Sequence, residues 1–248
     1  MHGPTLRART VGELLDTAFQ VVRARYAELA FATLVLVSPA LVLNFLLADV
    51  ARPAALLLQT FLLNYVTAAA VVIVSNVYLG RASDPNEVYR RVFSRFWPIF
   101  GAAMLQILAI GAGMLLCVVP GIYLAVALFA MPVVVMLENA GPVDAFDRSQ
   151  KLAGEHWGRI AGSMLLASLL VGIAQFGTGL LFSLARPLSP WMADMAGNVV
   201  TVLLAPFPAV VATLMYYDLR IRKEGFDIQA LMEAMGPASA TETPAPAY

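Results

Sequence analysis

The chain contains few charged residues, two histidines and a single cysteine. Only 13% of its 248 residues are charged, against about 25% in an average soluble domain, and 60% are hydrophobic. The lone Cys117 excludes an intrachain disulfide framework, and His2 and His156 are too few for a histidine-based metal centre. Lys plus Arg equals Asp plus Glu, 16 of each, so net charge indicates no nucleic-acid partner. This composition is typical of a membrane protein.

Long runs without any charged residue are the main positive feature. They cover 29–48, 53–80, 96–137, 160–185 and 195–217. A membrane core about 30 Å thick needs roughly 20 helical residues, so four runs suit one span each. The run 96–137 suits two spans, with Pro120-Gly121 predicted as the turn between them. We therefore expect an all-α polytopic protein with six transmembrane helices, at about 29–48, 55–79, 98–118, 121–137, 160–184 and 195–217.

The basic residues predict the orientation. Segments on the inner side of the six spans hold 14 of the 16 Lys and Arg residues, and the outer loops hold only Arg52 and Arg186. Because cytoplasmic loops retain Lys and Arg, both termini are expected in the cytoplasm. No cleaved signal peptide is expected, since the first apolar run starts late and is long enough to span. Residues 1–231 are expected to form one membrane domain, and the Pro/Ala/Thr-rich tail 232–248 to be disordered and cytoplasmic.

Three inner segments predict short amphipathic helices at the membrane interface. The first opens with a capping box of Thr10 and Glu13, the second at Asp84 and the third at Gly141. The expected apolar faces are Val11, Leu14, Leu15, Ala18, Phe19 and Val22; Val88, Tyr89, Val92, Phe93 and Phe96; and, more weakly, Val143, Phe146 and Ala153. Each segment ends in an aromatic depth anchor: Tyr26, Trp97 and Trp157. The pattern predicts a threefold repeat of a short helix plus a membrane hairpin, about 60 to 70 residues per unit.

The sequence offers no set of catalytic residues. The predicted spans contain no Asp, Glu, Lys, Arg or His, which counts against an ion-driven transporter. HExxH, CxxC, GxSxG and phosphate-cradling glycine motifs are absent, so we expect no enzyme, no metal and no cofactor. The neutral polar residues in the spans are expected to bond between helices, or alternatively to line a polar cavity. These residues are Asn44, Gln59, Asn64, Gln106, Gln175 and Asn198.

Four segments resemble a known bacterial family. RTVGELLDTAF, VVPGIYLAVALFAMPVVVMLEN, AFDRSQKLAGEHW and YYDLRIRKEGFDI occur in this order. Over most of residues 9–231 they resemble the glycerophosphoryl diester phosphodiesterase membrane domain, a six-span region that in some relatives precedes a soluble, metal-dependent enzyme. Only 31 residues follow Tyr217, so we expect that enzyme domain to be absent here. The resemblance implies a stand-alone protein of the bacterial inner membrane.

The positions that match this family include the candidate functional residues. They are Glu13, Glu138, Arg148, Ser149, Asp218, Arg220, Glu224 and Asp227. We expect the acids near the end of the last span to form exposed pairs with arginines of the other inner helices, as a cytoplasmic collar. The favoured function is a non-enzymatic scaffold or accessory subunit that docks a partner protein there. The alternative is a lipid-binding or permease-like protein linked to glycerophosphodiester or envelope-lipid metabolism, because basic interfacial helices attract anionic headgroups. The partners expected are therefore membrane lipids and a cytoplasmic protein.

Overall fold

The computed structural model describes residues 10–46, 52–78, 84–185 and 190–224, and all regular structure in these residues is helical. The helices are α1 (Val11–Ala24), α2 (Tyr26–Leu46), α3 (Arg52–Tyr78), α4 (Pro85–Ser94), α5 (Phe96–Leu116), α6 (Val118–Ala127), α7 (Met131–Leu137), α8 (Pro142–Ala153), the 3-10 turn η1 (Gly154–His156), α9 (Trp157–Ala185), α10 (Pro190–Leu204) and α11 (Pro206–Glu224). Six helical segments are long and apolar enough to cross a membrane, so the protein is a multi-pass membrane protein.

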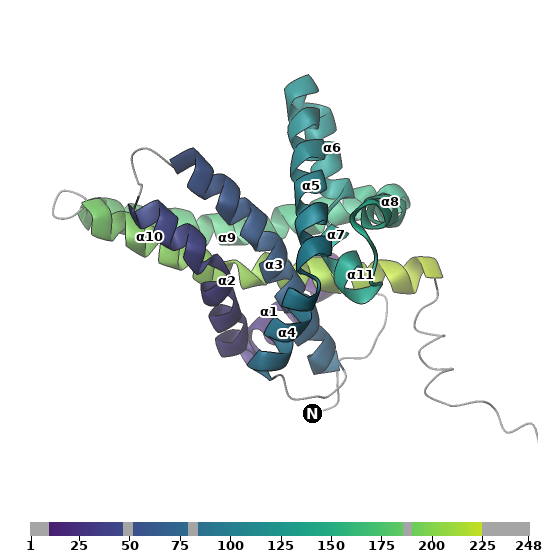
Figure 1. The fold of residues 1–248 in the computed structure, drawn as a ribbon, viewed down its shortest axis with the longest axis horizontal. Helices are drawn as coiled ribbons and strands as arrows, with labels where there is room; N and C mark the ends of the chain where they lie inside the picture. The colour runs from purple at the N-terminus through teal and green to yellow at the C-terminus, as the bar shows by residue number, and fades with distance from the viewer. Residues whose placement is uncertain (1–9, 47–51, 79–83, 186–189, 225–248) are drawn as a thin grey trace, which may run out of the picture.

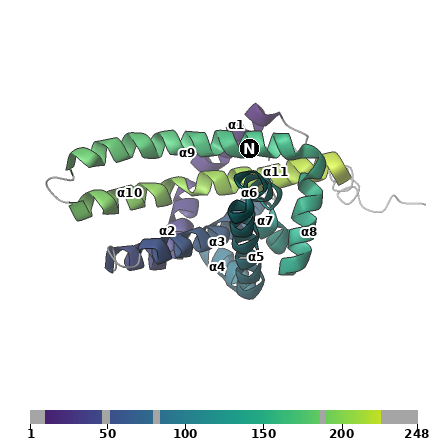
Figure 2. The same cartoon turned by 90° about the horizontal axis from the view of Figure 1, so that it is seen from above.

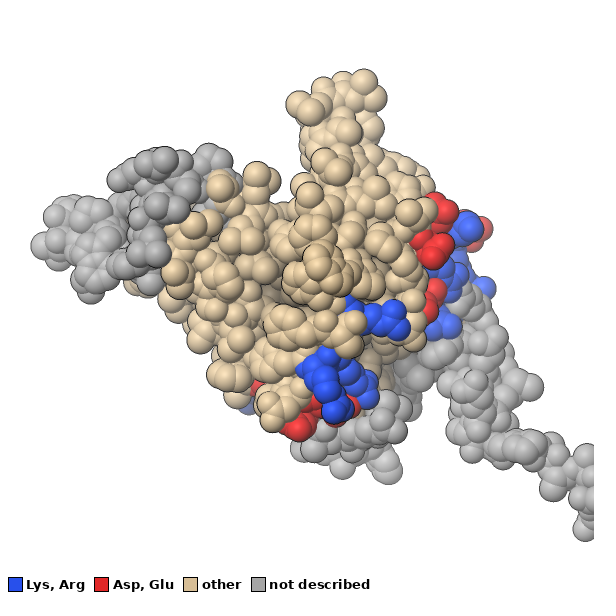
Figure 3. All heavy atoms as spheres, in the orientation of Figure 1, with Lys and Arg blue, Asp and Glu red and all other residues tan. Residues whose placement is uncertain are grey.

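Three helical hairpins build most of the structure. α2 packs along α3, α5 along α6, and α9 along α10, and the three hairpins diverge from a common base (Figures 1 and 2). Many of their apolar side chains are exposed, for example Leu115 at 91% and Phe176 at 77%. A soluble protein rarely leaves such a continuous apolar surface open to water, so lipid is the expected surroundings. Figure 3 shows the charged side chains gathered around α4, α8 and the end of α11, and none on the α5–α6 hairpin.

The last helix forms the centre of the base. α11 packs against α3, α1 and α9, and Figure 2 shows it nearly in line with α10. Pro206 opens α11 after a one-residue break at Ala205, because a proline at the first helical position has no intrahelical N–H bond to lose. Val210, Leu214 and Leu219 are among its fully buried side chains. The helix of the last span continues to Glu224, past the predicted end of the span near 217, and Asp218 in its charged end is buried.

The turn of the second hairpin differs from the sequence prediction. Cys117, with an extended backbone (φ −170°, ψ 151°), separates α5 from α6. Pro120 and Gly121 lie in the first turn of α6, where proline is tolerated because the first N–H groups of a helix have no intrahelical acceptor. Gly121 instead provides close packing: a Cβ there would lie 2.8 Å from the backbone nitrogen of Met114. The prediction of Pro120-Gly121 as the turn was therefore wrong.

Gly121→Ala is expected to lower the free energy of unfolding by about 1–3 kcal/mol, because the added methyl forces α5 and α6 apart. Equilibrium unfolding in mixed detergent micelles measures this change. Gly111→Ala on α5 is the matched control, since a Cβ at Gly111 would meet nothing within 4 Å. Equal stability of Gly121→Ala and Gly111→Ala would contradict the close approach of these two helices.

The three short helices precede the three hairpins, and the buried face of the third matches the expected one only in part, since Ala153 is buried and Phe146 packs against the core. Val143 is 67% exposed, whereas Ala145, Ser149 and Leu152 are buried. These three residues turn toward α5 and α7, which pack against α8. Ala145 and Ser149 are small and allow that close contact. A prediction based on bulky apolar side chains does not include them. Tyr26 and Trp157 are the first residues of the long helices α2 and α9, and Trp97 is the second residue of α5.

Candidate functional site

Three consecutive residues of α11 contact three different parts of the base. Successive residues of an α-helix point about 100° apart, so Tyr216, Tyr217 and Asp218 face different neighbours. The Tyr216 hydroxyl donates to Glu138 Oε1 at 2.6 Å, at the end of α7. The Tyr217 hydroxyl lies 3.0 Å from Ser75 Oγ of α3. Because Ser75 already donates to the Val71 carbonyl, Tyr217 is the donor in this pair.

Glu138 lies at the centre of the first ionic cluster. Arg148 Nε of α8 lies 3.0 Å from both carboxylate oxygens of Glu138. The Arg220 guanidinium is 5.8 Å from the centre of the Tyr216 ring, and its Nη1 donates to the Tyr216 hydroxyl at 3.4 Å. Asn139, the residue after Glu138, adopts a left-handed backbone (φ 55°) that asparagine tolerates better than most residues. The side chain of Arg95 donates to Asn139, which ties the start of α5 to the same turn.

Asp218 forms the second ionic cluster and is almost fully buried. Its Oδ2 accepts from Arg159 Nε of α9 at 3.0 Å and from Arg222 Nε, one turn along α11, at 2.9 Å. The Asp218 side chain is only 3% exposed, against 19% for Arg159 and 31% for Arg222. The expectation of an exposed pair was therefore wrong for Asp218. The start of α9 and the end of α11 enclose this carboxylate, which only tertiary packing could reveal.

Ser149 completes the backbone of a broken helix. The fourth span is interrupted between α6 and α7, near Pro132. The buried Ser149 hydroxyl donates to the Ala127 carbonyl at 2.8 Å and accepts from the Ala130 amide at 3.2 Å. Proline has no N–H for the carbonyl four residues before it, so the Leu128 carbonyl accepts instead from the Met131 amide at 3.3 Å. Gln106 Nε2 of α5 donates to the same carbonyl at 2.9 Å. Two side chains thus satisfy the backbone groups that the break releases.

The other candidate residues have local roles or lie outside the described part. Glu13 forms the predicted capping box with Thr10: its Oε2 accepts from the Thr10 amide at 2.8 Å, and its amide donates to Thr10 Oγ1 at 3.3 Å. Glu224 is the last residue of α11, and its side chain is outside the described residues, as are Asp227 and the tail 232–248. Asn64 bonds to carbonyls of its own helix, at Thr60 and Phe61.

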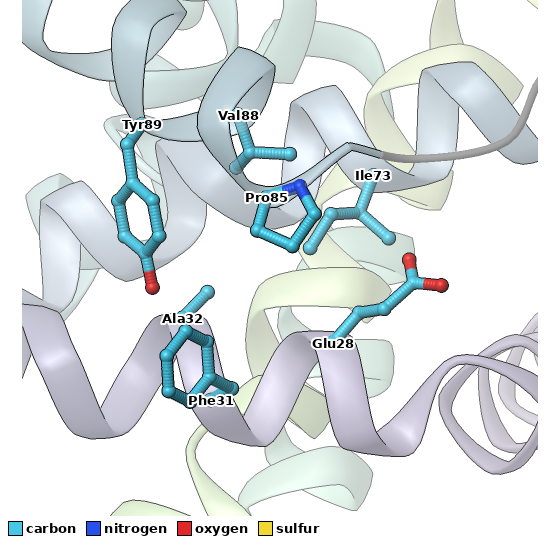
Figure 4. Close-up of a pocket in the computed structure, with 7 residues that line it drawn as sticks. All are labelled: Glu28, Phe31, Ala32, Ile73, Pro85, Val88 and Tyr89. Carbon is cyan, nitrogen blue, oxygen red and sulfur yellow. The ribbon is translucent and has the colours of Figure 1, made fainter.

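A small cavity lies between α2, α3 and α4 (Figure 4). Its volume is about 10 Å³, and its walls are mostly apolar. The lining residues are Glu28, Phe31, Ala32, Ile73, Pro85, Val88 and Tyr89. Within the described residues, Glu28 Oε2 and the Tyr89 hydroxyl are buried and have no hydrogen-bond partner. Burial raises the pKa of Tyr89 above its ordinary value, so this phenol is neutral at physiological pH.

The geometry indicates a structural role for most of the candidate residues. Within the described residues, no group of three His, Cys, Asp or Glu side chains is placed to hold a metal ion. The carboxylates of Glu138 and Asp218 already accept charge-assisted hydrogen bonds from arginines. Sequence reasoning missed Tyr216, Tyr217 and Arg159 as parts of this network. The polar triplet Tyr216-Tyr217-Asp218 at the end of an apolar run was the available signal, because polar side chains buried between membrane helices need partners.

Comparison with known proteins gives no relative: no protein family, curated protein or solved structure matches the chain. The resemblance to the glycerophosphoryl diester phosphodiesterase membrane domain therefore stays a prediction.

Proposed function

We propose that the protein is a non-enzymatic scaffold or accessory subunit that docks a partner protein at the cytoplasmic face of a bacterial inner membrane. The contact network of α11 carries this proposal. Tyr216, Tyr217 and Asp218 join α7, α3 and α9 to one central helix. Such cross-links favour a fixed cytoplasmic platform, since buried charged groups that are fully paired hold one arrangement of helices. The enrichment of Lys and Arg on this side supports its cytoplasmic placement.

The contacts of the spans count against the permease-like alternative. Asn64 bonds within its own helix, and Gln106 is engaged by the released Leu128 carbonyl. Both amides therefore satisfy backbone groups rather than line a path through the bundle. The cavity between α2, α3 and α4 has a volume of about 10 Å³, which is room for one water-sized group, so this cavity is not itself a path for a transported amphiphile.

A threefold repeat of short helix plus hairpin fits this platform. Measured from the N-caps Thr10, Asp84 and Gly141, the residues at four and eight positions along are buried in every short helix. These residues are Leu14 and Ala18, Val88 and Val92, and Ala145 and Ser149. The long helices that follow start at Tyr26, Phe96 and Trp157, and the residue three further on, Leu29, Ile99 or Ile160, is buried each time. We infer that three similar units surround the base, each with an amphipathic helix at the membrane interface.

The docking surface is expected on the outward face of α8. The side chains of Asp144, Asp147 and Lys151 are exposed there, whereas Glu138 and Asp218 are engaged inside the base. An exposed charged face suits recognition of a partner, because electrostatic complementarity between surfaces sets specificity and association rate.

Charge reversal tests this surface. Asp147→Lys is expected to reduce the amount of co-purifying partner at least tenfold, without lowering the thermal stability of the purified protein. Affinity purification of the tagged protein from its own membrane, followed by mass spectrometry, measures the partner. Arg90→Glu on the exposed face of α4 is the matched control, since it reverses one charge on another short helix. Equal recovery of every co-purifying protein with wild type, Asp147→Lys and Arg90→Glu would overturn docking on α8.

A further inference from the structure

The cavity between α2, α3 and α4 contains an unusual acceptor. Glu28 Oε1 accepts a hydrogen bond from Arg25 Nη1 at 2.7 Å. Its other oxygen, Oε2, is buried against the apolar lining, and no donor from the described residues reaches it. A buried charged acceptor without a donor is unfavourable, so this position calls for a donor from outside the described residues.

The cavity faces the region where lipid headgroups meet the spans. Glu28 is the third residue of α2, the first long apolar helix, and Phe31 on the cavity wall is 54% exposed. Arg25, one turn before Glu28, is 30% exposed at the junction of α1 and α2. Figure 4 shows Ile73 of α3 beside the Glu28 carboxylate, with Pro85 of α4 next to Ile73. A lipid headgroup that approaches the cavity would therefore meet the Arg25 guanidinium at the surface and the Glu28 carboxylate inside the cavity.

We propose that this cavity binds the primary ammonium group of a zwitterionic phospholipid. The ammonium donates to Glu28 Oε2, and the lipid phosphate lies beside Arg25. Each charge of the headgroup then faces a charge of opposite sign, the ammonium at Glu28 and the phosphate at Arg25. A guanidinium group also matches the geometry of phosphate oxygens. The edge-to-face pair of Phe31 and Tyr89, with ring centres 6.5 Å apart, forms an aromatic wall that also favours a cation.

The size of the cavity sets the specificity. A volume of about 10 Å³ holds one group of the size of a water molecule. A primary ammonium is of that size and has three N–H donors, whereas a trimethylammonium group is larger and has none. The site should therefore bind ethanolamine phospholipids in preference to choline phospholipids with the same acyl chains.

Native mass spectrometry of the purified, delipidated protein tests this specificity. The protein is titrated with phosphatidylethanolamine or phosphatidylcholine of identical acyl chains, and the bound fraction is measured. We expect about tenfold tighter binding of phosphatidylethanolamine, and a loss of that preference in Glu28→Gln, which keeps the shape but removes the charge. Glu87→Gln is the matched control, because Glu87 also pairs with an arginine and is 30% exposed, against 28% for Glu28. This control should retain the wild-type preference.

A second variant keeps the test decisive if Glu28→Gln folds poorly. Ala32→Val leaves the carboxylate in place and fills part of the cavity, and it should also abolish the preference for ethanolamine. Equal binding of the two lipids by the wild-type protein would overturn the proposal and leave a water molecule as the occupant. An unchanged preference in folded Glu28→Gln would overturn it as well.

Discussion

Replacing Asp218 by alanine is expected to lower the free energy of unfolding by about 3–5 kcal/mol. The Asp218 side chain is 3% exposed and accepts hydrogen bonds from Arg159 and Arg222. Its removal leaves two guanidinium groups close together in the base without their shared anion. Charges that lose their partner in a desolvated site are strongly destabilising, whereas an exposed ion pair contributes only about 0–1 kcal/mol. The large effect expected thus depends on the burial of Asp218.

Equilibrium unfolding by SDS titration in mixed micelles measures this effect. Asp147→Ala is the control, because Asp147 is exposed on α8 and its loss should change stability by no more than about 0.5 kcal/mol. Arg159→Ala should destabilise by less than Asp218→Ala, since Arg222 continues to pair with the carboxylate. A change below about 1 kcal/mol in Asp218→Ala would contradict a buried pair and favour the exposed collar expected from the sequence.

The second large effect is expected at Ser149. Ser149→Ala removes one hydroxyl that bonds to both the Ala127 carbonyl and the Ala130 amide. Both backbone groups lie at the break between α6 and α7, where water does not readily replace the lost partner. Each buried polar group left unpaired costs about 1–3 kcal/mol, so the expected loss for the two groups is about 2–6 kcal/mol.

The same unfolding assay, with Ser94→Ala as the control, tests this expectation. Ser94 is an exposed serine near the end of α4, and its hydroxyl donates to the Arg91 carbonyl of its own helix. Its removal should change stability by no more than about 0.5 kcal/mol. If Ser149→Ala and Ser94→Ala were equally stable, Ser149 would not be the residue that satisfies the broken span.

The spans were predictable from sequence because the length of an apolar run and the thickness of a membrane determine them. The position of Pro120 relative to the start of a helix was not predictable. The sequence predicts that Pro120 ends a helix, but in the first turn of α6 it removes no hydrogen bond. The charged residues after 217 predict a membrane exit, and α11 itself continues as a helix to Glu224.

The candidate site was predictable in its membership but only partly in its geometry. Arg148 and Glu138, ten residues apart, were both singled out, yet nothing in the sequence places them across the turn between α7 and α8. Asp218 looked exposed because several charged residues follow it in the chain, and only the packing of α9 against α11 buries it. The buried face of α8 consists of Ala145, Ser149, Leu152 and the expected Ala153, and the small Ala145 and Ser149 give a weak periodic signal.

The burial of Asp218 moves the expected docking surface from the end of α11 to α8. Charge reversal at Asp218 would disturb the base, so loss of a partner in that variant would not distinguish docking from unfolding. Exposed Asp147 and Lys151 separate the two effects, because neither is buried in the base.

Native mass spectrometry of the protein, extracted gently from its own membrane, tests the proposed function most directly. We expect a second protein bound at fixed stoichiometry, with or without an attached phospholipid. We also expect Asp147→Lys to lose the protein partner and keep the lipid, because the two sites lie on different helices, α8 and α2–α4. A chain that carries lipid alone under every gentle extraction would contradict the scaffold and favour lipid binding as its function.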